Sequence, residues 1–96
     1  MCYTYFVRIE WDPSQAATNK RKHGVSFREA STCFADPLAL LLDDKAHPER
    51  LVLIGVSERD RVLFTVFAEV ADDGVRIISA RKATTHERRR YEEEGE

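Results

Sequence analysis

The sequence is poor in cysteine: Cys2 and Cys33 are its only two, and they are too few and too far apart for a disulfide framework or a zinc site. We therefore expect both to be reduced thiols in an intracellular protein. No apolar run reaches the roughly 18 residues that a membrane span needs, and the first residues lack the basic-then-apolar order of a secretion signal. The sequence thus predicts a cytoplasmic protein with no membrane association.

An excess of one charge sign is also absent. The 96 residues include 15 Lys or Arg and 17 Asp or Glu, for a net charge of −2. Overall charge therefore gives no sign of a nucleic-acid partner, and any such role must come from local clusters. The chain is long enough for one hydrophobic core and too short for two, so we expect residues 1–96 to form a single domain.

The first part of the chain predicts one strand and two helices. Residues 3–11 alternate apolar and polar side chains with the period of a half-buried strand. Asp12, followed by proline, is a good helix start, and Gly24 is a good helix end. Ser26 and Glu29 then form a capping box for a second helix, which an Asp-Pro pair ends.

The rest of the chain predicts strands followed by a helix. Four apolar runs, at 38–43, 50–57, 61–70 and 75–82, are separated by short polar turns that include an Asp-Gly pair and an Arg-Asp link. Thr84 and Glu87 make a capping box for a last helix. The order β-α-α-β-β-β-β-α predicts an α+β fold, with two N-terminal helices and a C-terminal helix packed on an antiparallel sheet.

Positive charge gathers in two segments. Residues 20–28 hold four Lys or Arg and no acid, and residues 76–90 hold six with Glu87 as the one acid. Pairing of the last two strands places Arg81 opposite Phe64, near the strand end where Arg61 enters, whereas an acid such as Glu69 lies about 17 Å or more away, at about 3.4 Å per residue. We therefore expect a cationic cluster at this end of the sheet.

Such a cluster suits RNA chemistry. The guanidinium groups of Arg61 and Arg81 can hold a phosphate and stabilise the charge that grows on phosphorus during attack by a 2′-hydroxyl. His23 is the candidate to move a proton near neutral pH, and this reaction class needs no metal or other cofactor. The candidate RNA-binding residues that flank these catalytic candidates are Lys22, Lys82 and Arg59.

Each assignment has a structural alternative. The cations before Gly24 suit a solvated helix C-terminus, which the helix dipole favours. Arg61 could balance nearby turn acids, and the arginines before Tyr91 could pair with the terminal glutamates at i,i+4 spacing. Tyr91 is either a general acid or, more simply, a packed aromatic. Two aspartates and a histidine at 43–47 resemble metal ligands only loosely.

The whole sequence resembles a known family, the BrnT toxins of BrnT/BrnA type II toxin-antitoxin systems. Matching stretches are "EWDPSQAATNKRKHGVSFREASTCFADP" at 10–37, "LVLIGVSERDRVLFTVFAE" at 51–69 and "RIISARKATTHERRRYEE" at 76–93. The family's K-H-G motif falls on Lys22, His23 and Gly24, and its A-R-K motif on Arg81 and Lys82. At 14–16 this chain has "SQA" where many members carry a lysine.

The resemblance implies a RelE-like fold and a ribonuclease that inhibits translation and growth by cutting RNA. It also implies a BrnA-like antitoxin with a ribbon-helix-helix DNA-binding domain. This antitoxin would form a heterotetramer with the toxin, and the complex would bind operator DNA only through the antitoxin. The alternative function is a non-catalytic module, a degenerate toxin that binds only nucleic acid or the antitoxin. A binder would show a steep salt dependence of affinity and no new RNA ends.

Overall fold

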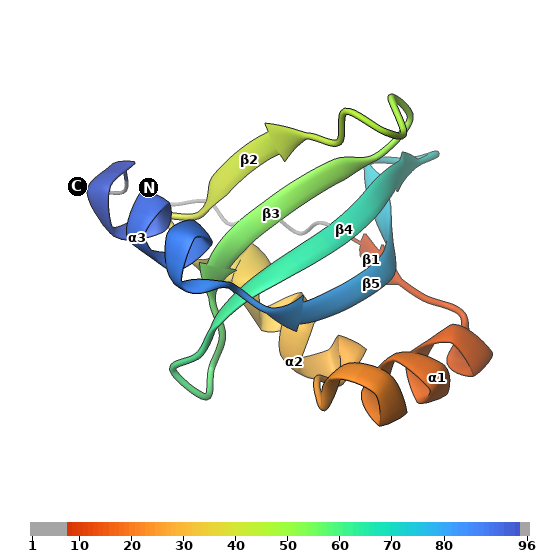
Figure 1. Cartoon of the computed structure of the whole chain (residues 1–96). Helices are drawn as coiled ribbons and strands as arrows, with labels where there is room; N and C mark the ends of the chain where they lie inside the picture. Colours follow the sequence, from red (N-terminus) through yellow and green to blue (C-terminus); the bar gives the residue numbers. More distant parts are fainter. Residues whose placement is uncertain (1–7, 95–96) are drawn as a thin grey trace.

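The computed structural model describes residues 8–94 and confirms the predicted α+β fold and order of elements (Figure 1). None of the described helices is both long and apolar enough to cross a membrane. The elements are β1 (Arg8–Glu10), α1 (Pro13–His23), α2 (Phe27–Thr32), the 3-10 turn η1 (Cys33–Ala35), β2 (Leu40–Asp43), β3 (Leu51–Val56), β4 (Val62–Val70), β5 (Gly74–Lys82) and α3 (Thr85–Glu94). The first part of the predicted N-terminal strand, residues 3–7, lies outside the described residues.

The five strands form one sheet in the order β1-β5-β4-β3-β2. The last three strands, β3 to β5, were expected to form an antiparallel meander and do so, and β2 extends it by pairing antiparallel with β3. Strand β1 differs, because it pairs with β5 in parallel, with Ile9 opposite Val75. The sheet is therefore mixed rather than wholly antiparallel. The long connection from β1 through both helices and three strands allows the parallel direction, which a short hairpin would forbid.

The starts of α1 and α2 and the end of α1 follow the local sequence as predicted, whereas α2 ends at Thr32 and the 3-10 turn η1 continues to the Asp-Pro pair. The Asp12 carboxylate accepts a hydrogen bond from the Ser14 N–H at 3.2 Å, at the start of α1. Gly24 ends this helix with φ of 72°, a left-handed conformation in which a β-carbon is strained, and its N–H donates to the Lys20 carbonyl. Ser26 caps α2 by accepting from the Glu29 N–H at 3.0 Å.

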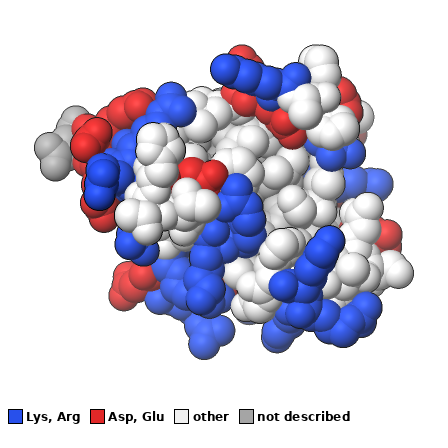
Figure 2. All heavy atoms as spheres, in the orientation of Figure 1, with Lys and Arg blue, Asp and Glu red and all other residues white. Residues whose placement is uncertain are grey.

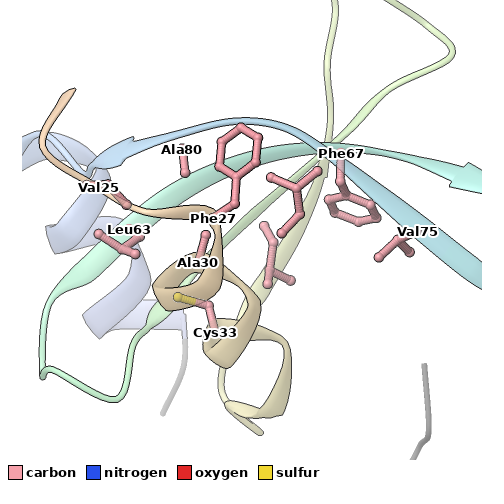
Figure 3. Close-up of a cluster of buried hydrophobic side chains, with 10 residues drawn as sticks. Val25, Phe27, Ala30, Cys33, Leu63, Phe67, Val75 and Ala80 are labelled. Carbon is pink, nitrogen blue, oxygen red and sulfur yellow. The ribbon is translucent and has the colours of Figure 1, made fainter. Parts of the chain in front are cut away.

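The main core lies between one face of the sheet and helix α2 (Figure 3), and Ala16 of α1 packs against it. Phe27 and Ala30 of α2 meet Leu63 of β4 there, and all three are at most 1% exposed. Cys33 is buried in the same cluster and has no disulfide partner among the described residues, while Cys2 lies outside them. Burial raises the pKa of the Cys33 thiol to about 12, so the thiol stays protonated at neutral pH.

The β4–β5 hairpin has the predicted register at its open end, where Phe64 faces Arg81 and Leu63 faces Lys82. A bulge between Val66 and the next residue shifts the register by one toward the turn. The pairs that involve Arg81 and Lys82 lie on the open-end side of this bulge, so the shift in register does not affect them.

The turn of this hairpin is centred at Asp72 and Asp73, where the predicted pairing of Arg81 with Phe64 also centres it, one residue before the Asp73-Gly74 pair. Asp72 and Asp73 adopt positive φ values of 63° and 57°, and Gly74 already belongs to β5. Gly74 is needed for space instead, because a β-carbon there would lie 2.7 Å from an Nη atom of Arg8. The glycine therefore lets the Arg8 side chain cross the start of β5, where its guanidinium donates to the Ala71 carbonyl at 2.5 Å.

Candidate functional site

The sheet separates the two predicted catalytic arginines. Lys82 pairs with Leu63, whose side chain lies in the core beneath the helices. Arg61 lies one residue before β4, and its guanidinium contacts Glu29 of α2 on the same face. Arg81 pairs with Phe64 and therefore points to the opposite face, because successive side chains of a strand alternate. Arg61 and Lys82 thus share the face of α1 and α2, and Arg81 lies on the face of α3.

Arg61 is held by a buried carboxylate. Its Nε donates to Glu29 Oε2 at 2.9 Å and an Nη atom donates to Glu29 Oε1, although Glu29 is only 3% exposed. The Ser57 hydroxyl also donates to Glu29 Oε2, at 2.6 Å. The Arg61 hydrogen bonds and then that of Ser57 keep the pKa of the Glu29 carboxyl below its usual value against the opposing effect of burial. Three of the five guanidinium N–H groups of Arg61 are not used by Glu29.

Arg81 is held by a different carboxylate, on α3. Its two Nη atoms donate to Glu87 at 2.8 Å and 3.0 Å, and its guanidinium lies 4.0 Å from the centre of the Phe64 ring. Glu87 also accepts from the Thr84 N–H, while its own N–H donates to the Thr84 hydroxyl, so the predicted capping box is present. The hydrogen bonds from Arg81 lower the pKa of the Glu87 carboxyl.

Asn19 connects the end of α1 with β5, a role that the sequence analysis missed. This side chain is 6% exposed, and its Nδ2 donates to the carbonyls of Val25 at 3.0 Å and Ala80 at 2.8 Å. Its Oδ1 accepts from the Ala80 N–H at 3.1 Å. Asparagine disfavours a helix interior, and this is the signal that could have pointed to a side-chain role. Asn19 fixes the helix turn that carries Lys22 and His23 against β5.

The other four candidate residues have no side-chain partner among the described residues. His23, Lys22, Arg59 and Lys82 are exposed, and within residues 8–94 no hydrogen bond or ion pair joins their side chains to another side chain. Across the part of the chain that the structure describes, the Lys and Arg residues without an ion pair are Lys20, Arg21, Lys22, Arg28, Lys45, Arg59, Lys82, Arg88 and Arg89. Figure 2 shows cationic side chains gathered over the lower part of the molecule, over α1 and beside the ends of β4 and β5.

Tyr91 has the structural role that was the simpler alternative. Its hydroxyl donates to Asp36 Oδ2 at 2.6 Å, and Asp36 also accepts from the N–H groups of Leu38 and Val56. Burial and this hydrogen bond raise the pKa of Tyr91 to about 12, which makes the phenol a poor proton shuttle near neutral pH. On the same helix, Arg90 pairs with Glu94 at 2.7 Å, as i,i+4 spacing predicts.

No group of three or more His, Cys, Asp or Glu within residues 8–94 is arranged to hold a metal ion. The acids near His47 serve the turn instead: Asp44 accepts from the Ala46 N–H, and Glu49 lies 3.7 Å from the His47 ring.

Comparison with known proteins decides the family. Residues 11–87 match the family model described as the ribonuclease toxin, BrnT, of type II toxin-antitoxin systems. The chain belongs to the BrnT family. Among solved structures, it is similar to the 1.1 Å crystal structure of the Brucella abortus ribonuclease toxin, BrnT, with 27% identity and a TM-score of 0.67, over 82% of this chain and 99% of that one. Among curated proteins no match is found.

Membership of the BrnT family makes this chain the toxin of a type II toxin-antitoxin system, in a family of ribonucleases, and implies an antitoxin as partner. The match begins at Trp11 and ends at Glu87, so it includes Asn19, both arginines and the carboxylates that hold them. The fold is that of a solved BrnT toxin.

Proposed function

We propose that this BrnT-family toxin is a metal-independent endoribonuclease that inhibits translation and growth by cutting RNA. The observation that carries the proposal is the Glu29-held guanidinium of Arg61, which keeps three N–H donors at the end of the sheet, beside unpaired cations. A guanidinium fixed in advance stabilises developing phosphorane charge without reorganising during the reaction.

The proposed reaction needs one proton acceptor and one proton donor. The 2′-oxygen attacks the adjacent phosphorus and loses its proton, the bond from phosphorus to the 5′-oxygen breaks, and that oxygen gains a proton. The products are a 2′,3′-cyclic phosphate and a 5′-hydroxyl. His23 is the group proposed to move a proton, and Arg61 is proposed to stabilise the phosphorane.

The other cations have supporting roles in this proposal. Lys22, Lys82 and Arg59 hold phosphates on either side of the cut, because they are exposed and carry no ion pair within the described residues. Arg81 acts from the other face of the sheet, around the ends of β4 and β5, with the N–H groups that Glu87 does not use. RNA would then wrap over this end of the sheet.

We further propose that the toxin is cytoplasmic and that the antitoxin is BrnA-like, with a ribbon-helix-helix domain. A dimer of that domain would join two toxins in a heterotetramer, and operator DNA would be bound through the antitoxin alone. The unpaired cations of the toxin would then serve RNA rather than the operator.

The test is to incubate the purified, antitoxin-free toxin with labelled RNA in excess EDTA, with and without translating ribosomes. We expect products that end in a 2′,3′-cyclic phosphate. Intact RNA under both conditions, with retained affinity for RNA, would instead support the non-catalytic binding module.

Substitution of Arg61 then tests its role. Because Arg61→Ala would leave the buried Glu29 carboxylate unpaired, we pair it with Glu29→Gln in one double variant. We expect cleavage to fall at least about a hundred-fold, the size of effect that removal of one oxyanion-stabilising donor has in other enzymes. Arg76→Ala is the matched control, because Arg76 is an exposed, ion-paired arginine on the same sheet. Full cleavage by the folded double variant would remove Arg61 from the reaction.

A further inference from the structure

The outer edge of the sheet at β2 is open among the described residues. Strand β2 is the last strand in the order and pairs with β3 on one side only. The two exposed large apolar side chains among the described residues lie in β2 or just before it: Leu41, within the strand, is 61% exposed, and Leu38, two residues before the strand, is 52% exposed. A sheet edge with apolar side chains is a template for pairing with another chain.

The backbone of β2 presents a regular set of unused groups. The Asp44 N–H donates to the Arg50 carbonyl at 3.4 Å, which continues the register in which Leu42 faces Val52. In an antiparallel ladder, residues alternate between bonding inward and facing outward. Leu41 and Asp43 therefore direct their N–H and carbonyl groups away from β3. These four groups can accept the ladder of one more strand.

Two of the devices that block a sheet edge, a bulge and a proline or lysine, are missing from this strand. Its register runs without a bulge from Leu40 to Asp43, and it contains no proline or lysine. Many proteins protect edges with these features. Its short length, four residues, and the exposed charge of Asp43 limit pairing, so we expect an added segment of similar length and of complementary charge.

The charge of this edge selects the kind of partner. The Asp43 side chain is exposed and makes no ion pair within residues 8–94, and it lies on the same face as Leu41, two residues away. Residues 36–49 hold four acids and one lysine. A second copy of this chain would bring like charges together, and symmetric pairing centred on Leu42 would place Leu41 against the carboxylate of Asp43. A basic, partly apolar segment fits better.

We propose that β2 is the docking edge for an extended segment of the antitoxin, which adds a sixth strand to the sheet. The segment places an apolar side chain beside Leu41 and a lysine or arginine two residues away, beside Asp43. Backbone hydrogen bonds from β2 supply affinity, and these two side chains supply selectivity. The proposal rests on membership of a toxin-antitoxin family and is independent of RNA cleavage.

Its location also separates two functions. Strand β2 lies two strands from β4, at the opposite side of β3 from the strands that end at Arg61 and Lys82. A segment bound at β2 therefore anchors the antitoxin without contacting these cations, and inhibition of RNA cleavage needs a further part of the antitoxin. Substitutions at β2 should release the antitoxin and leave cleavage by the free toxin unchanged.

The experiment uses the toxin co-expressed with the antitoxin of its system. Titration calorimetry with the separated proteins gives the dissociation constant for the unaltered toxin, Asp43→Lys and Leu41→Pro. The proline removes an outward N–H and no bond to β3, so the fold is kept. We expect each variant to raise the constant at least ten-fold. Glu69→Lys, the same charge reversal at an exposed position on β4, should leave it within two-fold.

Hydrogen exchange of the unaltered complex supplies a second readout that does not depend on any variant. We expect the amides of Leu41 and Asp43 to gain protection on complex formation, while the amide of Leu42, already bonded to β3, changes little. Unchanged dissociation constants for both variants, unprotected amides, or sedimentation showing that β2 joins two toxin copies would overturn the proposal. A failure of the free toxin to cut RNA would contradict the proposed ribonuclease activity and would leave the proposed binding at β2 unaffected.

Discussion

At the scale of single residues, the site depends on carboxylates that come from distant parts of the chain. The sequence suggested that nearby turn acids could balance Arg61, but Glu29, 32 residues away, holds it. The capping box did place Glu29 at the start of α2, and only its N–H performs that role. Its side chain turns inward instead, to Arg61 and Ser57. Nothing in the local sequence distinguishes these two uses of one glutamate.

This buried ion pair predicts a pH dependence of stability. Because the folded state lowers the pKa of Glu29, its contribution to stability is complete above the unfolded value near 4.5 and is lost as pH falls through the folded value. We expect Glu29→Gln to lower the free energy of unfolding by about 2 to 3 kcal/mol at pH 7. Urea unfolding at several pH values should show this difference shrinking below about pH 4. Glu58→Gln, in an exposed turn, is the control, and a difference that does not change with pH would contradict the assignment.

Asn19 predicts a loss of stability at neutral pH. Replacement by alanine would leave the Ala80 N–H and the carbonyls of Val25 and Ala80 buried without their partner. We expect Asn19→Ala to lower the free energy of unfolding by about 3 kcal/mol, measured by urea unfolding. Thr18→Ala, an exposed position on the same helix, should change it by no more than about 0.5 kcal/mol. Equal effects of the two substitutions would show that Asn19 makes no special contribution.

At the scale of elements, local signals predicted what local contacts decide. Asp12, Gly24 and Ser26 mark helix ends in the sequence and perform these roles in the structure, because a cap needs only residues a few positions apart. The hairpin register placed Arg81 opposite Phe64 for the same reason. The parallel pairing of β1 could not be predicted in this way, because it joins strands that are more than 60 residues apart.

The same reasoning explains why the candidate site was predicted only in part. The candidate residues come from charge and spacing, and the hairpin register predicted which of them lie at one end of the sheet. The face of the sheet on which each arginine lies depends on strand parity and on the position of α3. No short-range sequence pattern predicts where α3 packs. Glu87 appeared in the sequence in two separate ways, as the one acid of a basic segment and as part of a capping box. The structure shows that this glutamate also forms the ion pair with Arg81.

The hydrogen bond from Tyr91 to Asp36 should stabilise helix α3. None of its residues is buried, so the Arg81–Glu87 pair and the bond from Tyr91 to Asp36 are the main polar links that hold it among the described residues. We expect Tyr91→Phe to lower the free energy of unfolding by about 1 kcal/mol and to raise hydrogen exchange in α3 more than in α1. Arg90→Ala, on the exposed side of the helix, should do neither. Uniform exchange changes across both helices would mean that Tyr91 does not anchor α3 specifically.

At the scale of the whole molecule, the net charge of −2 conceals a division of charge. Arginines in ion pairs, such as Arg61 and Arg81, are fixed in place by carboxylates, whereas the exposed cations around them carry no ion pair within the described residues. The first group suits a reacting phosphate, which needs rigid donors. The second suits phosphates along a strand, which exchange their counterions for protein cations. Strand β2, with the exposed Asp43, lies at another edge of the sheet, so the basic partner that we propose there would not compete with the proposed RNA path.

This division predicts the salt dependence of RNA binding. For single-stranded RNA, each phosphate neutralised by a protein cation contributes about −0.7 to the slope of log K against log salt concentration. We expect Lys22→Ala and Lys82→Ala each to make that slope less negative by about 0.7, measured by fluorescence anisotropy with a labelled RNA. Arg90→Ala should leave the slope unchanged, because Arg90 is already paired with Glu94. Equal slopes for all three variants would show that RNA does not follow the unpaired cations beside β5, and would require a different path across the molecule.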